Sequence, residues 1–261
     1  MPEARVLRPH SIPSLYTMSE QPLLVVERRE DHLWLRLNRP EKANALSAGL
    51  MEDATRVLIE SANDASVRAI VLTGSGERVF SAGVDVREQP ADGDMAAHRR
   101  RRSAALSALT DALLDNPKPV IVALNGIASG GGAMLALLAD ARLAAENAAL
   151  SLPEIDLGMS TFTGAAIAEQ VGGLALAVDL VQTGRRMPAQ EALVRGLVNV
   201  VVGRAELEDA AGRFATMLAR KHPDAFATNK RWLNRRMKAV LAEARAAHET
   251  HRKAHDGESL T

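Results

Sequence analysis

Two continuous apolar runs that end in glycines constrain the fold of this chain of 261 residues more than any other feature. Residues 68–76 read RAIVLTGSG, and residues 118–126 read KPVIVALNG. Strands that are buried on both faces have this pattern, and they are typical of parallel sheets covered by helices. Segments with helical spacing of apolar residues alternate with these runs, so the sequence predicts a layered α/β fold.

Three further segments support this prediction. Residues 23–40 contain two alternating runs around a polar turn, which is typical of paired strands. Residues 47–64 have apolar residues at helical spacing, with Ser47 placed to cap the helix. Residues 141–155 predict two short strands around a turn at Asn147.

Composition and periodicity divide the chain into three regions. The first 17 residues contain prolines and no apolar period, and they lack the apolar centre of a signal peptide. We expect a flexible arm at 1–17, a core at 18–204 and a polar, helical C-terminal region at 205–261. Regular structure is expected only after Met18, which is an alternative start of the protein.

Charge and cysteine content exclude several classes of function. The chain carries 32 Lys and Arg residues against 32 Asp and Glu residues, so no global charge attracts nucleic acid or a membrane surface. It has no cysteine, which excludes disulfides and thiolate chemistry and fits a reducing compartment. No apolar run approaches the roughly 18 residues that a membrane span needs. We therefore expect a cytoplasmic protein without nucleic-acid or membrane partners.

Residues 125–140, NGIASGGGAMLALLAD, place three glycines where a helix is expected to begin, although each costs about 1 kcal/mol relative to alanine in a helix. A P-loop would need a lysine directly after the glycines, and a dinucleotide fingerprint would need a different glycine spacing. Both phosphate-binding motifs are therefore excluded. Two interpretations stay open for the glycines alone: close packing of a helix on a sheet, or backbone N–H groups that hold a developing oxyanion.

A second glycine turn favours the oxyanion interpretation. Residues 77–88, ERVFSAGVDVRE, follow the first buried run and bend through Ser81, Ala82 and Gly83. The chain bends there without bulky side chains and offers another N–H group beside the carboxyl end of the sheet. Two converging donors of this kind stabilise negative charge on a substrate oxygen.

Four blocks of sequence, in the same order, resemble the enoyl-CoA hydratase/isomerase (crotonase) superfamily: LNRPEKANALS, VLTGSGERVFSAGVDV, VIVALNGIASGGGAMLALLADARLAAENAALSLPEIDLG and LVQTGRRMPAQEALVRGLVNVVV. The resemblance implies a crotonase-like ββα spiral core and a C-terminal helical region that builds homotrimers or dimers of trimers. It also implies an acyl-CoA substrate and no cofactor, because coenzyme A is part of the substrate. In the family the thioester oxygen lies between two backbone N–H groups, which map onto Val84 and Gly131.

The resemblance further implies residues that contact coenzyme A. The CoA-binding segment of the family corresponds to EKANAL, so Ala43 would face the adenine and Ala82 would line the substrate site. Arg78 and Arg87 fall where the family often has cations that contact phosphates. Either arginine could equally be an ordinary surface residue.

The residues at the expected reaction centre favour isomerisation over hydration. Adding water to an enoyl-CoA benefits from two carboxylates, one that takes a proton from water and one that delivers a proton to carbon. The family's hydratases have both, at positions that correspond here to Glu154 and Met134, so only Glu154 is able to transfer a proton. Phe162 stands where a small residue helps to house water. One carboxylate in a drier pocket, with Met134 and Phe162 against the substrate, resembles the 3,2-enoyl-CoA isomerases.

Several alternatives stay open. The chain could be a hydratase with an atypical second acid–base group, for which Asp156 would qualify if a strand places it on the face of Glu154. It could also bind acyl-CoA without catalysis. A serine hydrolase is disfavoured, because Ser129 stands one place early and no histidine lies between His98 and His222 to complete a triad.

The remaining polar clusters are interpreted as surface features. The run HRRRRSA at 98–104 indicates a solvated helix face or a mobile lid, with a phosphate contact as the alternative. His248, His251 and His255 indicate a polar helix face, and no metal site is expected. We expect Trp232 to pack within the C-terminal helical region.

Overall fold

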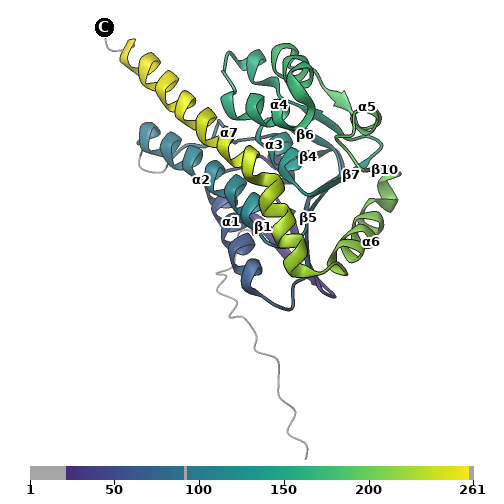
Figure 1. Cartoon of the computed structure of the whole chain (residues 1–261). Helices are drawn as coiled ribbons and strands as arrows, with labels where there is room; N and C mark the ends of the chain where they lie inside the picture. The colour runs from purple at the N-terminus through teal and green to yellow at the C-terminus, as the bar shows by residue number, and fades with distance from the viewer. Residues whose placement is uncertain (1–21, 91–92, 259–261) are drawn as a thin grey trace, which may run out of the picture.

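The computed structural model describes residues 22–90 and 93–258, with side chains up to residue 254. The arm expected at 1–17, Met18 and the side chain of His255 lie outside this description. Strands form two sheets (Figure 1). The first has the order β1 (Leu24–Arg29), β2 (His32–Leu37), β3 (Ala69–Gly74), β5 (Val120–Leu124), β7 (Ala141–Ala145) and β10 (Val200–Val202). The second has the order β4 (Val79–Ser81), β6 (Ile127–Ser129), β8 (Ala149–Ser151) and β9 (Met187–Pro188).

A strand–strand–helix unit is repeated along the chain. Strands β3, β5 and β7 are parallel neighbours in the large sheet, and each is followed by a short strand of the small sheet. The helical segments after these pairs are α2 (Met95–Asp115), α3 (Gly131–Leu138) and η2 (Pro153–Leu157) with α4 (Phe162–Ala177). This repeat confirms the predicted ββα spiral core.

The other helical elements complete the described part of the chain. They are η1 (Pro40–Lys42), α1 (Ala48–Asn63), η3 (Val178–Gln182), α5 (Ala189–Val194), η4 (Arg204–Glu206), α6 (Leu207–Ala219) and α7 (Pro223–Glu258). Ser47 caps α1 as predicted, because its side chain accepts a hydrogen bond from the N–H of Leu50.

The large sheet is covered on both faces, which explains the continuous apolar runs. In β3, Ile70 belongs to a core cluster with Leu109 of α2 and Leu135 of α3. The next residue, Val71, belongs to a second cluster with Ala211 of α6. Successive side chains of a strand point to opposite faces, so apolar residues follow one another along such a strand, and the buried Thr73 bonds its hydroxyl to the carbonyl of Ala123.

The segment Phe162–Gln182 corrects one expectation from the sequence. By length and composition alone it is apolar enough to cross a membrane, and only 33% of its most apolar stretch is buried within the chain. The helix is interrupted at Gly173, where φ is 79° and ψ is 172°. Leu174 and Val178 are exposed there, so the segment carries an exposed apolar face.

The long helix α7 runs along α2 and reaches α4 (Figure 1). Lys230 of α7 is buried and bonds to Asp140 at 2.6 Å and to the carbonyl of Lys118 at 3.1 Å. This ion pair fastens α7 to the sheet. The packing expected for Trp232 is wrong, because its side chain is 65% exposed and contacts the guanidinium of Arg235.

Candidate active site

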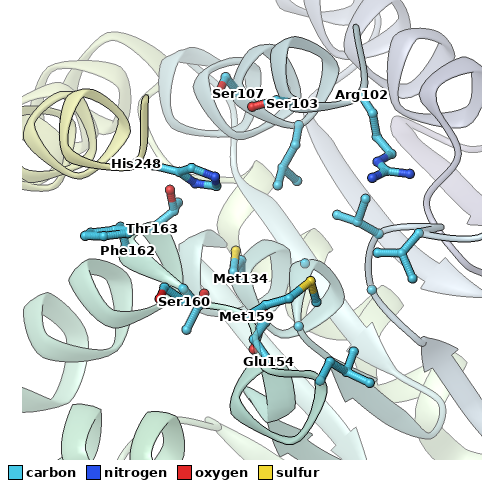
Figure 2. Close-up of a pocket in the computed structure, with 18 of the residues that line it drawn as sticks. Arg102, Ser103, Ser107, Met134, Glu154, Met159, Ser160, Phe162, Thr163 and His248 are labelled. Carbon is cyan, nitrogen blue, oxygen red and sulfur yellow. The ribbon is translucent and has the colours of Figure 1, made fainter. Parts of the chain in front are cut away.

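One cavity of about 420 Å³ brings together the two glycine turns, η2 and the helices α2, α4 and α7. Figure 2 shows Glu154 on one side of it, Ser103 and Ser107 of α2 on the opposite side, and Met134 between them. This volume lies in the range of small-molecule sites in proteins.

Glu154 contributes a carboxylate to the wall of the cavity. Among the described residues, its Oε2 is a buried side-chain oxygen without a hydrogen-bond partner. Burial raises the pKa of Glu154, while hydrogen bonds from its own backbone N–H and from the Thr161 side chain act in the opposite direction. A carboxylate with one oxygen left without a partner and a raised pKa is suited to take up a proton and return it.

The N–H groups of Val84 and Gly131 lie next to each other across the cavity wall. A Cβ atom added to Gly131 would be 3.5 Å from the nitrogen of Val84. Neither N–H group donates a hydrogen bond within the described part of the chain. The neighbouring N–H groups of Gly83 and Asp85 are bonded to Ser81 Oγ and to the carbonyl of Leu46, respectively. Two free donors therefore converge where a substrate oxygen could bind.

Helix α3 adds electrostatic support to this donor pair. It begins at Gly131, so the N–H groups of its first turn have no intrahelical partner. The aligned peptide dipoles favour negative charge at that end. At the other end, the Arg142 guanidinium bonds to the carbonyls of Ala136, Leu137 and Ala139.

Buried polar contacts hold the turn around Val84 in place. Arg39 forms a buried ion pair with Asp85 at 2.9 Å and also donates to the carbonyl of Ala45. The N–H of Leu46 donates to the carbonyl of Gly83 at 2.8 Å. The segment corresponding to the family's CoA-binding stretch is thereby fixed against the donor turn.

Met134 and Phe162 both line the cavity, as the sequence predicts. Phe162 begins α4 and lies against the rings of His248 and His251 of α7, at centroid distances of 5.9 Å and 5.4 Å. His248 is exposed, as expected of a polar helix face, and the two rings also border the cavity side of α7 through Phe162. Within the described residues, no group of three or more His, Asp or Glu side chains is arranged to hold a metal ion.

Only part of the expected CoA-binding set lies at the cavity. Ala82 lines it, and its N–H donates to the carbonyl of Ala43 at 2.9 Å, so Ala43 lies next to the cavity wall but does not line the cavity. Arg78 and Arg87 are exposed and do not line the cavity. Their contact with phosphates stays a prediction.

The expectation for Asp156 is wrong. Residues Pro153–Leu157 form a 3₁₀ helix rather than a strand, so alternation does not place Asp156 beside Glu154. The Asp156 side chain is exposed, lies close to Gly184 and does not line the cavity. The cavity is therefore left without this second acid–base candidate.

Sequence reasoning missed the contribution of α2 and α7. Arg99 and Arg102, within the run interpreted as a solvated face, line the cavity, whereas Arg101 pairs with Glu52 away from it. The spacing of three and four residues between polar positions of α2 was the available signal. Sequence alone does not show which helix face is turned to the site.

This arrangement can bind a carbonyl oxygen at two N–H groups and move a proton on a carbon next to that carbonyl. Negative charge that develops on the oxygen would be stabilised by the donor pair, and Glu154 would exchange the proton.

Comparisons with known proteins agree with this chemistry. Residues 29–258 match the family model described as enoyl-CoA hydratase/isomerase. The chain is 39% identical over 214 residues to the carnitinyl-CoA dehydratase of Escherichia coli K12, covering 82% of this chain and 80% of that one. It is 34% identical over 225 residues to the short-chain-enoyl-CoA hydratase of Clostridium acetobutylicum, covering 85% of each chain. The crystal structure of an enoyl-CoA hydratase from Bacillus anthracis superposes with a TM-score of 0.77 at 32% identity, covering 92% of each chain.

Proposed function

The chain belongs to the enoyl-CoA hydratase/isomerase family, whose members act on acyl-CoA, and from this premise we propose that it shifts the double bond of an enoyl-CoA. The proposed acid–base group is Glu154 alone. The observation that carries the proposal is that Met134 occupies the cavity wall where a second proton-transferring group would be needed for hydration.

In the proposed reaction, the thioester oxygen of a 3-enoyl-CoA accepts hydrogen bonds from the N–H groups of Val84 and Gly131. The Glu154 carboxylate removes a proton from C2, and the electrons move into a dienolate whose charge rests on the thioester oxygen. Protonated Glu154 then delivers the same proton to C4, which gives the 2-enoyl-CoA. Each oxyanion donor typically contributes about 100- to 1000-fold in rate.

The composition of the cavity supports a single working carboxylate. Glu249 of α7 also lines the cavity, but it is held in ion pairs with Arg252 at 2.7 Å and Lys253 at 3.6 Å. Met134 is only 5% exposed and offers no proton. Of the two cavity carboxylates in the described residues, Glu154 has no cationic partner and lies beside Gly130, next to the donor pair.

Hydration is the second candidate, because similar proteins are named as a hydratase and a dehydratase. It would need another group to protonate C2, and the ring of His248 lines the cavity. A carnitinyl-type substrate is less well supported. The carnitinyl group carries a quaternary ammonium, whereas four arginines line the cavity: Arg99, Arg102, Arg245 and Arg252.

We also propose that the protein works as a homotrimer. Large apolar side chains are exposed on α4 and on the first half of α7, including Leu174 at 66% and Leu233 at 73%. Exposed apolar surface of this kind marks association sites. A trimer would cover part of it.

The proposal is tested by supplying 3-hexenoyl-CoA and, separately, trans-2-hexenoyl-CoA to the purified protein and identifying products by mass spectrometry. We expect conversion of the first without gain of mass and no water added to the second. Gain of one water by the second at a comparable rate would establish a hydratase instead. Tight binding of both without turnover would establish an acyl-CoA binder.

Met134→Glu provides a gain-of-function test of the same proposal. It places a carboxylate on the cavity wall, three residues after Gly131 on α3, so we expect measurable hydration of trans-2-hexenoyl-CoA where the parent protein has little. Met134→Gln, which has similar size but transfers no proton at neutral pH, is the matched control. Equal hydration by both variants would show that the missing carboxylate is not the limiting feature.

A further inference from the structure

The far wall of the cavity is unusually polar for a site that binds a hydrocarbon chain. One stripe of α2 faces it with helical spacing: Arg99, Arg102, Ser103, Leu106, Ser107 and Thr110. Only one of these side chains is apolar. Figure 2 shows Arg102, Ser103 and Ser107 along this wall, across the cavity from Glu154.

Two of the four arginines that line the cavity are already paired with neighbouring carboxylates. Arg245 of α7 bonds to both oxygens of Asp111, at 2.9 Å and 3.0 Å, and also to Thr110. Arg252 bonds to Glu249 at 2.7 Å. Neither guanidinium is free to take a charged substrate group without giving up an existing ion pair.

Arg102 differs from these two arginines. Its Nη1 donates to the carbonyl of Asp85 at 2.8 Å, and within the described part of the chain it has no ion pair and no bond from Nη2 or Nε. The carboxylate of Asp85 is itself held by Arg39. A half-buried guanidinium is thus fixed beside the turn that carries Val84, with its remaining donors unused.

The serine hydroxyls on the same wall are also without partners. No hydrogen bond within the described residues uses Ser103 Oγ or Ser107 Oγ, although both residues line the cavity. An alkyl chain lying against them would displace their water without replacing its hydrogen bonds, which costs free energy. A polar acyl terminus would replace those bonds.

We propose that the substrate of this site is an acyl-CoA whose acyl group ends in a carboxylate, and that Arg102 binds this carboxylate. This inference rests on the proposed action on enoyl-CoA thioesters. The planar guanidinium fork matches a carboxylate better than an ammonium group does. Ser103, one residue along α2, is placed to donate a further hydrogen bond, and the exposed Arg99 adds positive charge at the rim.

Coenzyme A itself carries anionic groups, namely its phosphates. The pantetheine arm separates these phosphates from the thioester by many bonds, whereas Arg102 is bonded to the residue directly after the Val84 donor. Substrates that share coenzyme A and differ only at the acyl terminus show whether Arg102 binds the acyl carboxylate or a phosphate of coenzyme A.

The test compares 3-hexenoyl-CoA with 3-hexenedioyl-CoA, in which a carboxylate replaces the terminal methyl group. We expect a higher kcat/KM for the diacid thioester by about 10-fold or more, since hydrogen bonds to charged groups contribute about 1.5–3 kcal/mol. The preference should shrink as ionic strength rises, because salt screens exposed charges. An equal or lower kcat/KM for the diacid thioester would overturn the inference.

Arg102→Gln should lower the ratio of kcat/KM for the diacid thioester to kcat/KM for 3-hexenoyl-CoA by about 10- to 100-fold. Glutamine still has a donor for the carbonyl of Asp85. Arg102→Lys keeps the positive charge and loses the planar guanidinium. Its kcat/KM for the diacid thioester should lie between those of the parent protein and Arg102→Gln. Arg100→Gln is the matched control, because Arg100 is exposed and does not line the cavity. Equal losses on both substrates in Arg102→Gln would assign Arg102 to coenzyme A or to the scaffold and reject the inference.

Binding of the saturated thioesters separates this inference from the proposed reaction. Hexanedioyl-CoA should bind more tightly than hexanoyl-CoA by calorimetry, and Arg102→Gln should remove the difference while leaving hexanoyl-CoA binding intact. If this holds but no enoyl-CoA is turned over, the proposed function fails and the carboxylate site stands. Equal binding of the two thioesters by the parent protein rejects the carboxylate site whatever the activity.

Discussion

Gly130, Gly131 and Gly132 are consecutive residues, yet each lacks a side chain for a different physical reason. Gly130 has a φ of 50°, in the left-handed region that favours glycine. Gly131 approaches the Val84 donor, and a Cβ there would be 3.1 Å from Val84 Cγ2. Gly132 packs on Ser81, and a Cβ there would be 2.7 Å from Ser81 Cβ. The packing interpretation thus applies at Gly132, and Gly131 is the position proposed as an oxyanion donor.

Gly131→Ala is expected to damage catalysis more than stability. The added methyl group crowds the space between the two donors, so kcat should fall about 100- to 1000-fold, as for loss of one oxyanion donor. Alanine gains about 1 kcal/mol in helix propensity, which offsets some of the crowding. Steady-state kinetics and urea unfolding check this prediction.

Gly132→Ala is the contrasting control, because its methyl group would meet the side chain and backbone of Ser81 instead of the donor pair. Overpacking of this kind typically costs about 1–3 kcal/mol, so the urea midpoint should fall. Full activity in Gly131→Ala would reject Gly131 as an oxyanion donor.

Burial of the Glu154 carboxylate suits it to proton transfer and also lowers the stability of the native state. Because burial raises its pKa, the native state keeps this proton to a higher pH than the unfolded chain does. The native state therefore binds more protons between the ordinary and the raised pKa, and stability falls as pH rises through that window. The base form needed for catalysis is the form that destabilises the fold.

Glu154→Gln should lower turnover of 3-hexenoyl-CoA by about 100-fold or more, the usual contribution of a general base. At about pH 8 it should be more stable than the parent by about 1 kcal/mol, since the unpartnered charge is gone. The difference should vanish near pH 4, where an ordinary glutamate is about half protonated. Urea unfolding at both pH values measures the difference in free energy of unfolding between the variant and the parent protein. An equal difference at both pH values would contradict the buried charge as its cause.

At the scale of elements, two charged contacts position the helices that build the site. Arg142 closes the carboxyl end of α3 by bonding to its last carbonyls, which leaves the amino end to the substrate. Lys230 fixes α7 to the sheet through Asp140, which also accepts from the N–H of Val120. Both contacts lie away from the cavity and act on the geometry of its walls.

Lys230→Met is expected to destabilise the protein by about 3–5 kcal/mol, because it leaves the Asp140 charge buried without its partner. Adding Asp140→Asn should recover much of this loss, since asparagine keeps an acceptor for the Val120 N–H. Lys238→Met, which breaks an exposed pair with Asp115, should cost less than about 1 kcal/mol. Denaturant unfolding compares the three, and equal losses at positions 230 and 238 would reject the buried pair as the main anchor of α7.

At the scale of the whole molecule, the exposed apolar surface indicates self-association. Among the described residues, Leu174 of α4 and Trp232 and Leu233 of α7 are large apolar side chains that remain exposed. Covering these side chains in a trimer would remove apolar area from water, at roughly 25 cal/mol per Å². In the C-terminal region, which is expected to build the trimer, Leu233 of α7 is 73% exposed.

Leu233→Asp should shift the protein from trimer towards monomer at micromolar concentration, because it places a charge in the proposed interface. Ile59→Asp is the control, since Ile59 is also exposed but lies on α1. Light scattering after size exclusion gives the masses. A monomeric parent protein, or equal dissociation by both variants, would contradict the proposed role of the C-terminal region.

The local sequence determined the strands and the reactive turns. Unbroken apolar runs such as the one through Ile70 and Val71 occur because both faces of a strand are buried, and this pattern depends little on which helices cover it. The glycine turns at Gly83 and Gly131 were visible in the local sequence, because a turn and the donors it frees are local structures, whereas the role expected of Glu154 came from the resemblance to the family. These parts of the fold and site could be predicted.

Only the tertiary structure decided which side chains complete the cavity. Asp156 is two residues from Glu154, but a 3₁₀ helix turns it away, while His248 is far along the chain and α7 brings it to Phe162. Arg101 and Arg102 are adjacent and chemically identical, yet only Arg102 lines the cavity. Which of these side chains reaches the cavity depends on how distant helices pack and on how each is rotated about its axis. The local sequence does not determine this rotation, because many rotations of a helix bury a similar apolar area. The sequence alone therefore determined the backbone chemistry of the site, and the packing of α2 and α7 decided its polar far wall.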